Sequence, residues 1–193
     1  NEDISKFKNL NKKNLLINTN IEEKAPLAFD LGDLFETEAE INLITNAISH
    51  QFNKEPKTSK KLFSTLINGD LAKTFHENCD NIKNTLVIIK ACNGRRYGGF
   101  VSECWDSVTG YKSDSLAFTF SLDNLEVYEN IFGKKAIYCS FSYGPYFGKG
   151  FDIVIGNKCL SKKSSYTFLN LKETSFDYKG KNEALSGELD YSN

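Results

Sequence analysis

The sequence has 193 residues, of which 40% are hydrophobic and 13% aromatic, and its 24 Lys and Arg nearly balance its 25 Asp and Glu. This composition is typical of one globular domain with an extension, and it argues against a disordered chain. A net charge of −1 provides no strong field of either sign, so we expect neither nucleic acid nor an anionic membrane as a partner. The apolar run at residues 86–89 is far shorter than the roughly 20 residues of a membrane span, and we expect no membrane insertion.

The cysteines and the first residues bear on the compartment of the protein. Five cysteines are present without a C-x-x-C pair, and the start of the chain has no apolar segment of a secretory signal. Both observations predict a reducing, cytoplasmic location. The sequence contains no methionine, which leads us to expect a piece of a longer protein or a processed form. Its preference for Lys and Asn indicates an AT-rich, protist genome.

Residues 1–36 differ in pattern from the rest of the chain, and we interpret them as an N-terminal extension or docking segment. Ile4, Phe7 and Leu10 recur every three residues among polar side chains, as they would on one side of a helix. Such apolar side chains are unfavourable in water unless they pack against the domain or a partner. We therefore consider these three residues candidate partner contacts.

Two helices and one strand are predicted next along the chain. Residues 37–52 have a capping-box pattern, Thr37-x-x-Glu40, followed by apolar residues at helical spacing. Residues 60–67 resemble a strand that ends at an Asn-Gly pair. Residues 70–79 resemble a short helix, for which the initial aspartate is the expected N-cap.

From residue 85 onward the pattern is that of short β-strands. The apolar run at residues 85–92 predicts a central strand, and Asn93-Gly94 predicts a tight hairpin that leads into a return strand. Further strands are expected at residues 116–122, 136–142 and 151–156, with a weaker one at 165–171. The predicted fold class is α+β, mainly β: a two-sheet antiparallel sandwich flanked by short helices.

A pair of glycines, Gly98 and Gly99, interrupts the return strand. In a strand interior such a pair usually marks a bulge, a bend or a close approach of another backbone. We interpret it as a bend where the strand crosses a corner of the sandwich, with Trp105 anchoring the strand end in the core. A ligand-binding loop is the alternative interpretation.

A second glycine cluster lies at residues 142–156. Its glycines precede a predicted strand and not a helix, and the spacing differs from that of a phosphate-binding loop. We therefore expect no nucleotide at this site. The glycines in question are Gly144, Gly148 and Gly150.

The segments "YGGFVSECWDS", "DSLAFTFSL" and "AIYCSFSYGPYFGKGFDIVIGNKC" resemble the TLDc domain of the oxidation-resistance family, over about Ile41 to Asp177. The resemblance implies the same sandwich fold. It also implies that a set of signature residues shapes that fold: Gly98, Gly99, Trp105, Gly144, Gly148 and Gly150. The family domain closes with a strand that bears an acidic and then an aromatic residue. We expect the domain, residues 37–193, either to lack that strand or to form it from residues 184–191.

Few residues suggest a catalytic or metal-binding role. The chain has two histidines and no G-x-S-x-G motif, and His76 and Cys79 lack the further ligands of a zinc site. We expect His76 to face solvent or to cap its helix. The sequence thus predicts a non-enzymatic protein without cofactor or metal, and a thiol-dependent or hydrolytic enzyme is the alternative. Arg95 and Arg96 indicate either a solvated turn or a contact for an acidic partner surface.

The functional hypotheses rest on the resemblance to the TLDc domain. It implies a link to oxidative-stress protection and to binding of the vacuolar proton-pumping ATPase, which is the first expected partner. The second hypothesis is a structural component of a large cytoskeletal assembly such as a ciliary axoneme, which would place the protein in a cilium.

Overall fold

A computed structural model describes residues 32, 34–131, 133, 135–162 and 164–186. The chain divides into two compact units, and the larger one, Leu31–Pro56 with Lys60–Asn193, contains all the helices and strands of the described part. The predicted partner contacts Ile4, Phe7 and Leu10 lie outside the described residues.

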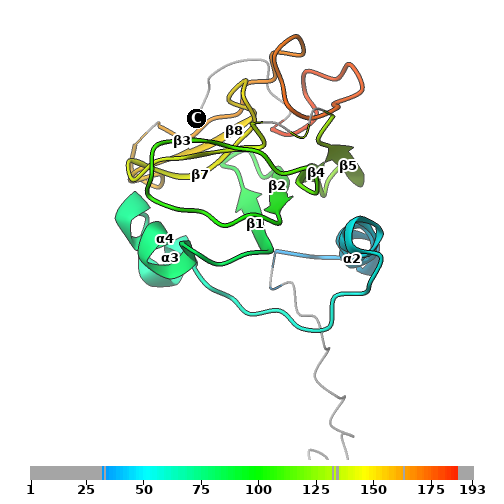
Figure 1. Cartoon of the computed structure of the whole chain (residues 1–193), viewed down its shortest axis with the longest axis horizontal. Helices are drawn as coiled ribbons and strands as arrows, with labels where there is room; N and C mark the ends of the chain where they lie inside the picture. The colour runs from blue at the N-terminus through cyan, green and yellow to red at the C-terminus, as the bar shows by residue number, and fades with distance from the viewer. Residues whose placement is uncertain (1–31, 33, 132, 134, 163, 187–193) are drawn as a thin grey trace, which may run out of the picture. The chain divides into compact units, whose positions relative to one another are not determined.

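Two four-stranded antiparallel sheets form the domain (Figure 1). The first sheet has the order β1 (Thr85–Lys90), β2 (Arg96–Val101), β4 (Phe118–Ser121) and β5 (Glu126–Glu129). The second has the order β3 (Gly110–Lys112), β6 (Ile137–Cys139), β7 (Tyr143–Phe147) and β8 (Ile153–Gly156). Together with a few short helices, these sheets confirm the predicted α+β, mainly β sandwich.

The first described helix, α2 (Glu38–Phe52), begins where the sequence predicts. Thr37 is its N-cap, and the reciprocal capping box with Glu40 is present. Ile44 and Ile48 are buried on one face, as the helical spacing indicates. With 15 residues, α2 is the longest helix of the described part, in which no helix has both the length and the apolarity to cross a bilayer.

Residues 60–67 do not form the expected strand, and the short helix α3 (Thr65–Asn68) occupies their second half. The Asn68 side chain accepts a hydrogen bond from the Ser64 N–H at 2.9 Å and so closes a helical turn. Leu62 and Phe63 pack against the core. This local side-chain bond competes with strand formation, which explains why the prediction was wrong.

Helix α4 (Ala72–Cys79) is present, but Asp70 is not its cap. The N-cap residue is Leu71, and the Asp70 carboxylate instead accepts the N–H of Leu160 at 3.0 Å. The first N–H of the helix, that of Ala72, donates to the side chain of Asn157 at 3.0 Å. A distant turn therefore caps this helix, which sequence spacing alone does not reveal.

The hairpin of β1 and β2 is antiparallel as expected, with two differences. β1 is an edge strand, not a central one, because β2 is its only neighbour in the sheet order. The connection spans residues 91–95, and within it Gly94 has a φ of +88° while Asn93 is not among the positive-φ residues. The loop is therefore longer than the predicted two-residue turn.

Three strands were not predicted, and a second predicted strand, at residues 165–171, is absent. β3 and β5 are short and carry polar or charged residues, and β7 contains a glycine and a proline, both of which disfavour strands in isolation. Residues 165–171 contribute only an isolated bridge, between Tyr166 and Val154.

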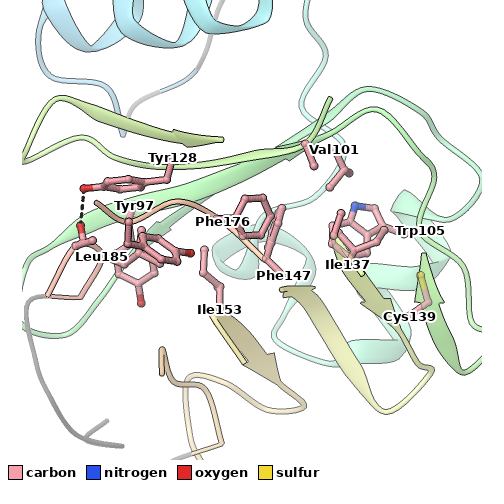
Figure 2. Packing of buried hydrophobic residues seen from close by; sticks show 14 of the residues in the cluster. Tyr97, Val101, Trp105, Tyr128, Ile137, Cys139, Phe147, Ile153, Phe176 and Leu185 are labelled. Atoms are coloured by element: carbon pink, nitrogen blue, oxygen red, sulfur yellow. Dashed lines mark hydrogen bonds between the residues drawn. The ribbon is translucent and has the colours of Figure 1, made fainter. Parts of the chain in front are cut away.

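The core lies between the two sheets (Figure 2). Tyr97, Val101 and Tyr128 of the first sheet meet Ile137, Phe147 and Ile153 of the second. The segment after β8 adds Phe176, Tyr178 and Leu185 to the same cluster. Of residues 184–191, the expected alternative for the last strand of the domain, 184–186 form no strand and 187–191 lie outside the described part.

Candidate protein-docking surface

The two glycines of β2 lie where this strand is tightly packed on both faces. The β1–β2 ladder runs through them without a shift of register, pairing Gly98 with Ile88 and Gly99 with Val87. A Cβ atom at Gly99 would collide with the ring of Phe147 from the second sheet, and one at Gly98 with the Val87 carbonyl oxygen. The glycines permit this close approach, and no bend interrupts the ladder.

Trp105 lies in the core, where α4 meets both sheets. Its ring nitrogen donates to the Thr85 hydroxyl at 2.9 Å, so the one polar atom of the side chain is satisfied. Its ring packs edge-on against Phe75 of α4 at 5.8 Å and against Phe147 of β7 at 5.5 Å between centroids. The position suits an anchor and offers no exposed group to a ligand.

Two glycines of the second cluster surround the buried carboxyl of Asp152. Gly148 has a φ of +78°, and a Cβ atom there would collide with this carboxyl, while one at Gly150 would lie 3.0 Å from its Oδ1. Oδ2 accepts from the Ser175 N–H at 3.3 Å and from the Tyr178 hydroxyl at 3.5 Å, whereas Oδ1 has no hydrogen-bond partner in the described part. Burial raises the pKa of Asp152 to about 7.

The third glycine of the cluster, Gly144, lies within β7 and has more space. A Cβ atom there would approach the Ile155 carbonyl oxygen to 3.4 Å, which is near ordinary contact. The three glycines are therefore not equivalent, and the tight packing is confined to the carboxyl of Asp152.

Arg96 lies inside the domain and forms an ion pair with Glu40 of α2. Its Nη2 is 2.8 Å from Glu40 Oε1, its Nη1 is 3.1 Å from Oε2, and Nη1 also donates to the Leu34 carbonyl at 3.1 Å. Burial opposes ionisation of Glu40, but the hydrogen bonds from Arg96 hold the pKa of this carboxyl below its usual value. The guanidinium thus joins α2 to the first sheet, and it is not exposed as the partner-contact hypothesis requires.

Arg95 is only partly buried. Its Nη1 donates to Asn124 Oδ1 at 3.3 Å, and the residue borders an open polar hollow that Glu126 and Lys181 also line. Lys181 is already paired with Glu126 at 2.7 Å. Of the two arginines, Arg95 alone retains the accessibility that a partner contact needs.

His76 is buried, which corrects the first of the two alternatives expected for this residue, that it faces solvent. Its Nδ1 lies 2.7 Å from Asp80 Oδ1, and its Nε2 lies 2.9 Å from the carbonyl oxygens of Ser140 and Tyr143. Nδ1 thus bonds Asp80, the residue that ends α4, while Nε2 joins α4 to the segment between β6 and β7. In the described residues, no three His, Cys, Asp or Glu side chains are grouped as a metal site would need.

The outward face of the second sheet carries a row of aromatic residues. Side chains alternate along a strand, so residues between the core-facing ones point away from the first sheet. Tyr111 of β3 pairs with Tyr138 of β6, and Tyr146 of β7 pairs with Val154 of β8, which bridges to Tyr166. Because Ile137 pairs with Phe147, Tyr138 lies opposite Tyr146, and one row that is aromatic except for Val154 crosses the sheet.

The rings of this row touch one another. The centroid of Tyr138 is 4.9 Å from that of Tyr111 and 5.1 Å from that of Tyr146. Phe151, which precedes β8, stacks on Tyr146 at 5.6 Å. The outer aromatic cluster consists of Tyr111, Tyr138, Tyr143, Tyr146, Phe151 and Tyr166.

Part of the outer aromatic cluster faces solvent. Tyr111 is 41% and Phe151 45% exposed, while Tyr146 is buried beneath its neighbours. The ammonium of Lys135 lies 5.2 Å from the centroid of the Tyr111 ring, a cation–π distance. Large rings with a polar rim are the side chains that protein interfaces favour.

Phe151 is also unusual in its backbone. Its φ is +67°, in the left-handed region that bulky side chains rarely adopt. The surrounding structure holds it there, since the Phe168 N–H donates to the Phe151 carbonyl at 3.1 Å. Strained backbone of this kind tends to occur at ligand contacts and other functional positions.

Sequence reasoning missed this surface because it missed β3 and β7. A usable signal was present, since Tyr138 and Tyr146 each lie one position from a core residue, Ile137 and Phe147. Recognising the row requires knowledge of the register between strands, which cannot be determined from a single sequence.

The fold, a two-sheet antiparallel sandwich with short helices, and a partly exposed aromatic face define a mainly β domain with a surface suited to protein contacts. The family model of the TLDc domain matches residues 35–190, so the chain belongs to the TLDc domain family. A comparison with curated proteins returned no match.

Proposed function

We propose that this chain is a non-enzymatic TLDc domain that docks onto a large protein complex. The observation that carries the proposal is the outer aromatic cluster. Its exposed rings are those of Tyr111 in β3 and Phe151 just before β8, and the opposite face of this sheet is fixed by the core, so the surface is preformed. Preformed surfaces lose little conformational freedom on binding, which favours affinity.

The environment of the two buried thiols, Cys79 and Cys139, and of His76 supports a role without catalysis. Burial raises the pKa of the Cys79 thiol to about 12 and that of the Cys139 thiol to about 11, so both are protonated and weakly nucleophilic at neutral pH. His76 already uses both ring nitrogens within the fold. The alternative of a thiol-dependent or hydrolytic enzyme has its best remaining test in a turnover assay.

Membership of the TLDc family supports the choice of partner. The resemblance to the oxidation-resistance proteins leads us to propose the vacuolar proton-pumping ATPase as the first partner and a role in oxidative-stress protection. A ciliary or other cytoskeletal lattice is the second candidate. Residues 1–36 are proposed to contribute further contacts through Ile4, Phe7 and Leu10.

The test is affinity purification of the tagged full-length protein, followed by mass spectrometry of the co-purifying proteins. We expect subunits of the proton pump with the wild-type chain and a loss of at least about tenfold with Tyr111→Ala/Phe151→Ala, because truncated anchor residues weaken interfaces strongly. The matched control is Phe52→Ala, since Phe52 is a similarly exposed aromatic residue on α2.

The outcomes separate the parts of the proposal. Axonemal proteins in place of pump subunits would favour the second candidate partner. Equal recovery with the double variant and the wild type would exclude the outer aromatic cluster as the docking surface. A substrate turned over by the purified chain would contradict the non-enzymatic role.

A further inference from the structure

A second surface, chemically different from the outer aromatic cluster, lies where α3 meets α4 (Figure 1). Leu66 is 89%, Ile67 75%, Leu160 66% and Leu71 40% exposed. We refer to these four residues as the aliphatic corner. Just before them, Leu62 and Phe63 pack against the core, so two apolar residues of this segment are turned inward and two outward.

Hydrogen bonds hold the aliphatic corner together. The turn after β8 is attached to the junction of the two helices at three points. The Asp70 carbonyl accepts from the Lys158 N–H at 2.9 Å, the Asp70 carboxylate from Leu160 at 3.0 Å, and the Asn157 side chain from Ala72 at 3.0 Å. Leu160 is therefore held beside α3 although more than 90 residues separate it from Leu66 in the sequence.

The charged side chains around the corner are mainly basic. Lys158 and Lys162 are exposed in the attached turn, Lys60 is exposed before α3, and Lys73 is exposed in the first turn of α4. The neighbouring carboxylates are those of Asp70, which accepts a backbone N–H, and of Glu77, which lies 3.6 Å from the Lys73 ammonium. The whole-chain charge of −1 conceals this local excess of lysine.

Aliphatic side chains beside lysines suit an anionic bilayer better than a protein. Leucine is under-represented among the energetically dominant residues of protein interfaces, where aromatic residues and arginine prevail. Leucine and isoleucine are instead among the residues that a bilayer accepts most readily, and lysine keeps its charge at the headgroups while its stem lies along apolar surface. Each lysine near an anionic leaflet also adds favourable electrostatic energy.

We propose that the aliphatic corner rests on an anionic membrane surface, with Leu66, Ile67 and Leu160 in the interfacial layer and the lysines at the lipid phosphates. This is peripheral contact by side chains, and no described helix crosses the bilayer. It does not depend on the outer aromatic cluster, which lies on the second sheet and would remain available to a protein.

The test is sedimentation of the purified full chain with vesicles of phosphatidylcholine alone or mixed equally with phosphatidylserine. We expect partition onto the mixed vesicles to be at least about tenfold stronger and to weaken with salt. Leu66→Ser/Ile67→Ser should lower it at least about tenfold, and so should Lys158→Glu/Lys162→Glu. The matched control is Val108→Ser, because Val108 is 74% exposed on a different loop.

Several results would overturn the proposal. Equal binding of the wild type to both vesicle types, or none to either, would do so. Unchanged binding of the leucine–isoleucine variant would also do so, as would a lowered melting temperature of that variant, since these side chains would then be covered within the protein. Capture of the proton pump through the outer aromatic cluster would be unaffected in every case, which separates this proposal from the proposed function.

Discussion

The two faces of the second sheet come from alternating residues of the same strands, yet their surroundings differ. On the inner face, Ile137, Phe147 and Ile153 are fully buried against the first sheet. On the outer face, Tyr138 of β6 is only half-buried, and Tyr111 of β3 and Phe151, just before β8, stay partly exposed. Both faces are apolar in composition, so hydrophobicity alone does not separate residues that stabilise the fold from residues that are available to a partner.

The largest expected contrast between the two faces concerns ring removal. Phe147→Ala should lower the free energy of unfolding by about 3–5 kcal/mol, because a buried ring leaves a cavity. Tyr138→Ala, one register position away on the outer face, should cost less than about 1.5 kcal/mol. Urea unfolding measures both, and equal losses would remove the distinction on which the comparison rests.

A pH-dependent contrast is expected next, at Asp152 beside the inner face. Its pKa is about 7 in the folded chain, above its ordinary value of 3.8. The folded state therefore holds a proton that the unfolded state releases, and stability should fall as the pH rises from about 4 through 7, by up to about 4 kcal/mol.

Asp152→Asn should remove most of this decline and make the protein more stable than the wild type at pH 8. The matched control, Asp177→Asn, changes an exposed carboxyl and should leave the decline in place. Thermal melts of the three proteins between about pH 4 and 8 provide the measurement. A wild type that is no less stable at the upper end would show that Asp152 ionises normally.

The third expected contrast is smaller and concerns the stability of two glycine-to-valine variants. Gly99→Val should cost roughly 2 kcal/mol or more, since the new side chain meets the Phe147 ring across the core. Gly110→Val in β3 is the matched control, because a Cβ atom there has open space, and it should change stability by less than about 0.5 kcal/mol. Superimposable denaturation curves for the two variants would refute the close-approach account.

The smallest effect is expected at Phe151. Phe151→Gly should change stability by less than about 1 kcal/mol, because relief of left-handed strain offsets the lost stacking on Tyr146. Phe151→Ala keeps the strain and should be about 1 kcal/mol less stable than the glycine variant. The order of the two melting temperatures checks this, and a more stable alanine variant would argue against strain at this position.

Local signals explain which parts of the fold were predictable. The capping box of α2 and the antiparallel β1–β2 hairpin involve residues close together in the chain, and both were predicted. The edge position of β1 and the capping of α4 by Asn157 depend on distant segments. Sequence patterns record periodicity and turn chemistry, but not which segment lies beside which.

The candidate sites show the same limit. Arg95 and Arg96 are adjacent and chemically identical, yet Arg96 is enclosed by Glu40 while Arg95 remains accessible. The outer aromatic cluster gathers residues from Tyr111 to Tyr166, which only the sheet register brings together. By contrast, the family could be recognised from the sequence, because its signature lies in contiguous segments that the TLDc match includes.

The central claim is that the outer face of the second sheet docks a protein. Its most direct test is a photo-crosslinking phenylalanine analogue placed at Tyr111, with Phe52 as the control position, in the full-length protein in its native cells. We predict a crosslink to one defined protein from position 111 and none to it from position 52. Equal crosslinking from both positions, or none from position 111 in a stably folded chain, would contradict the claim.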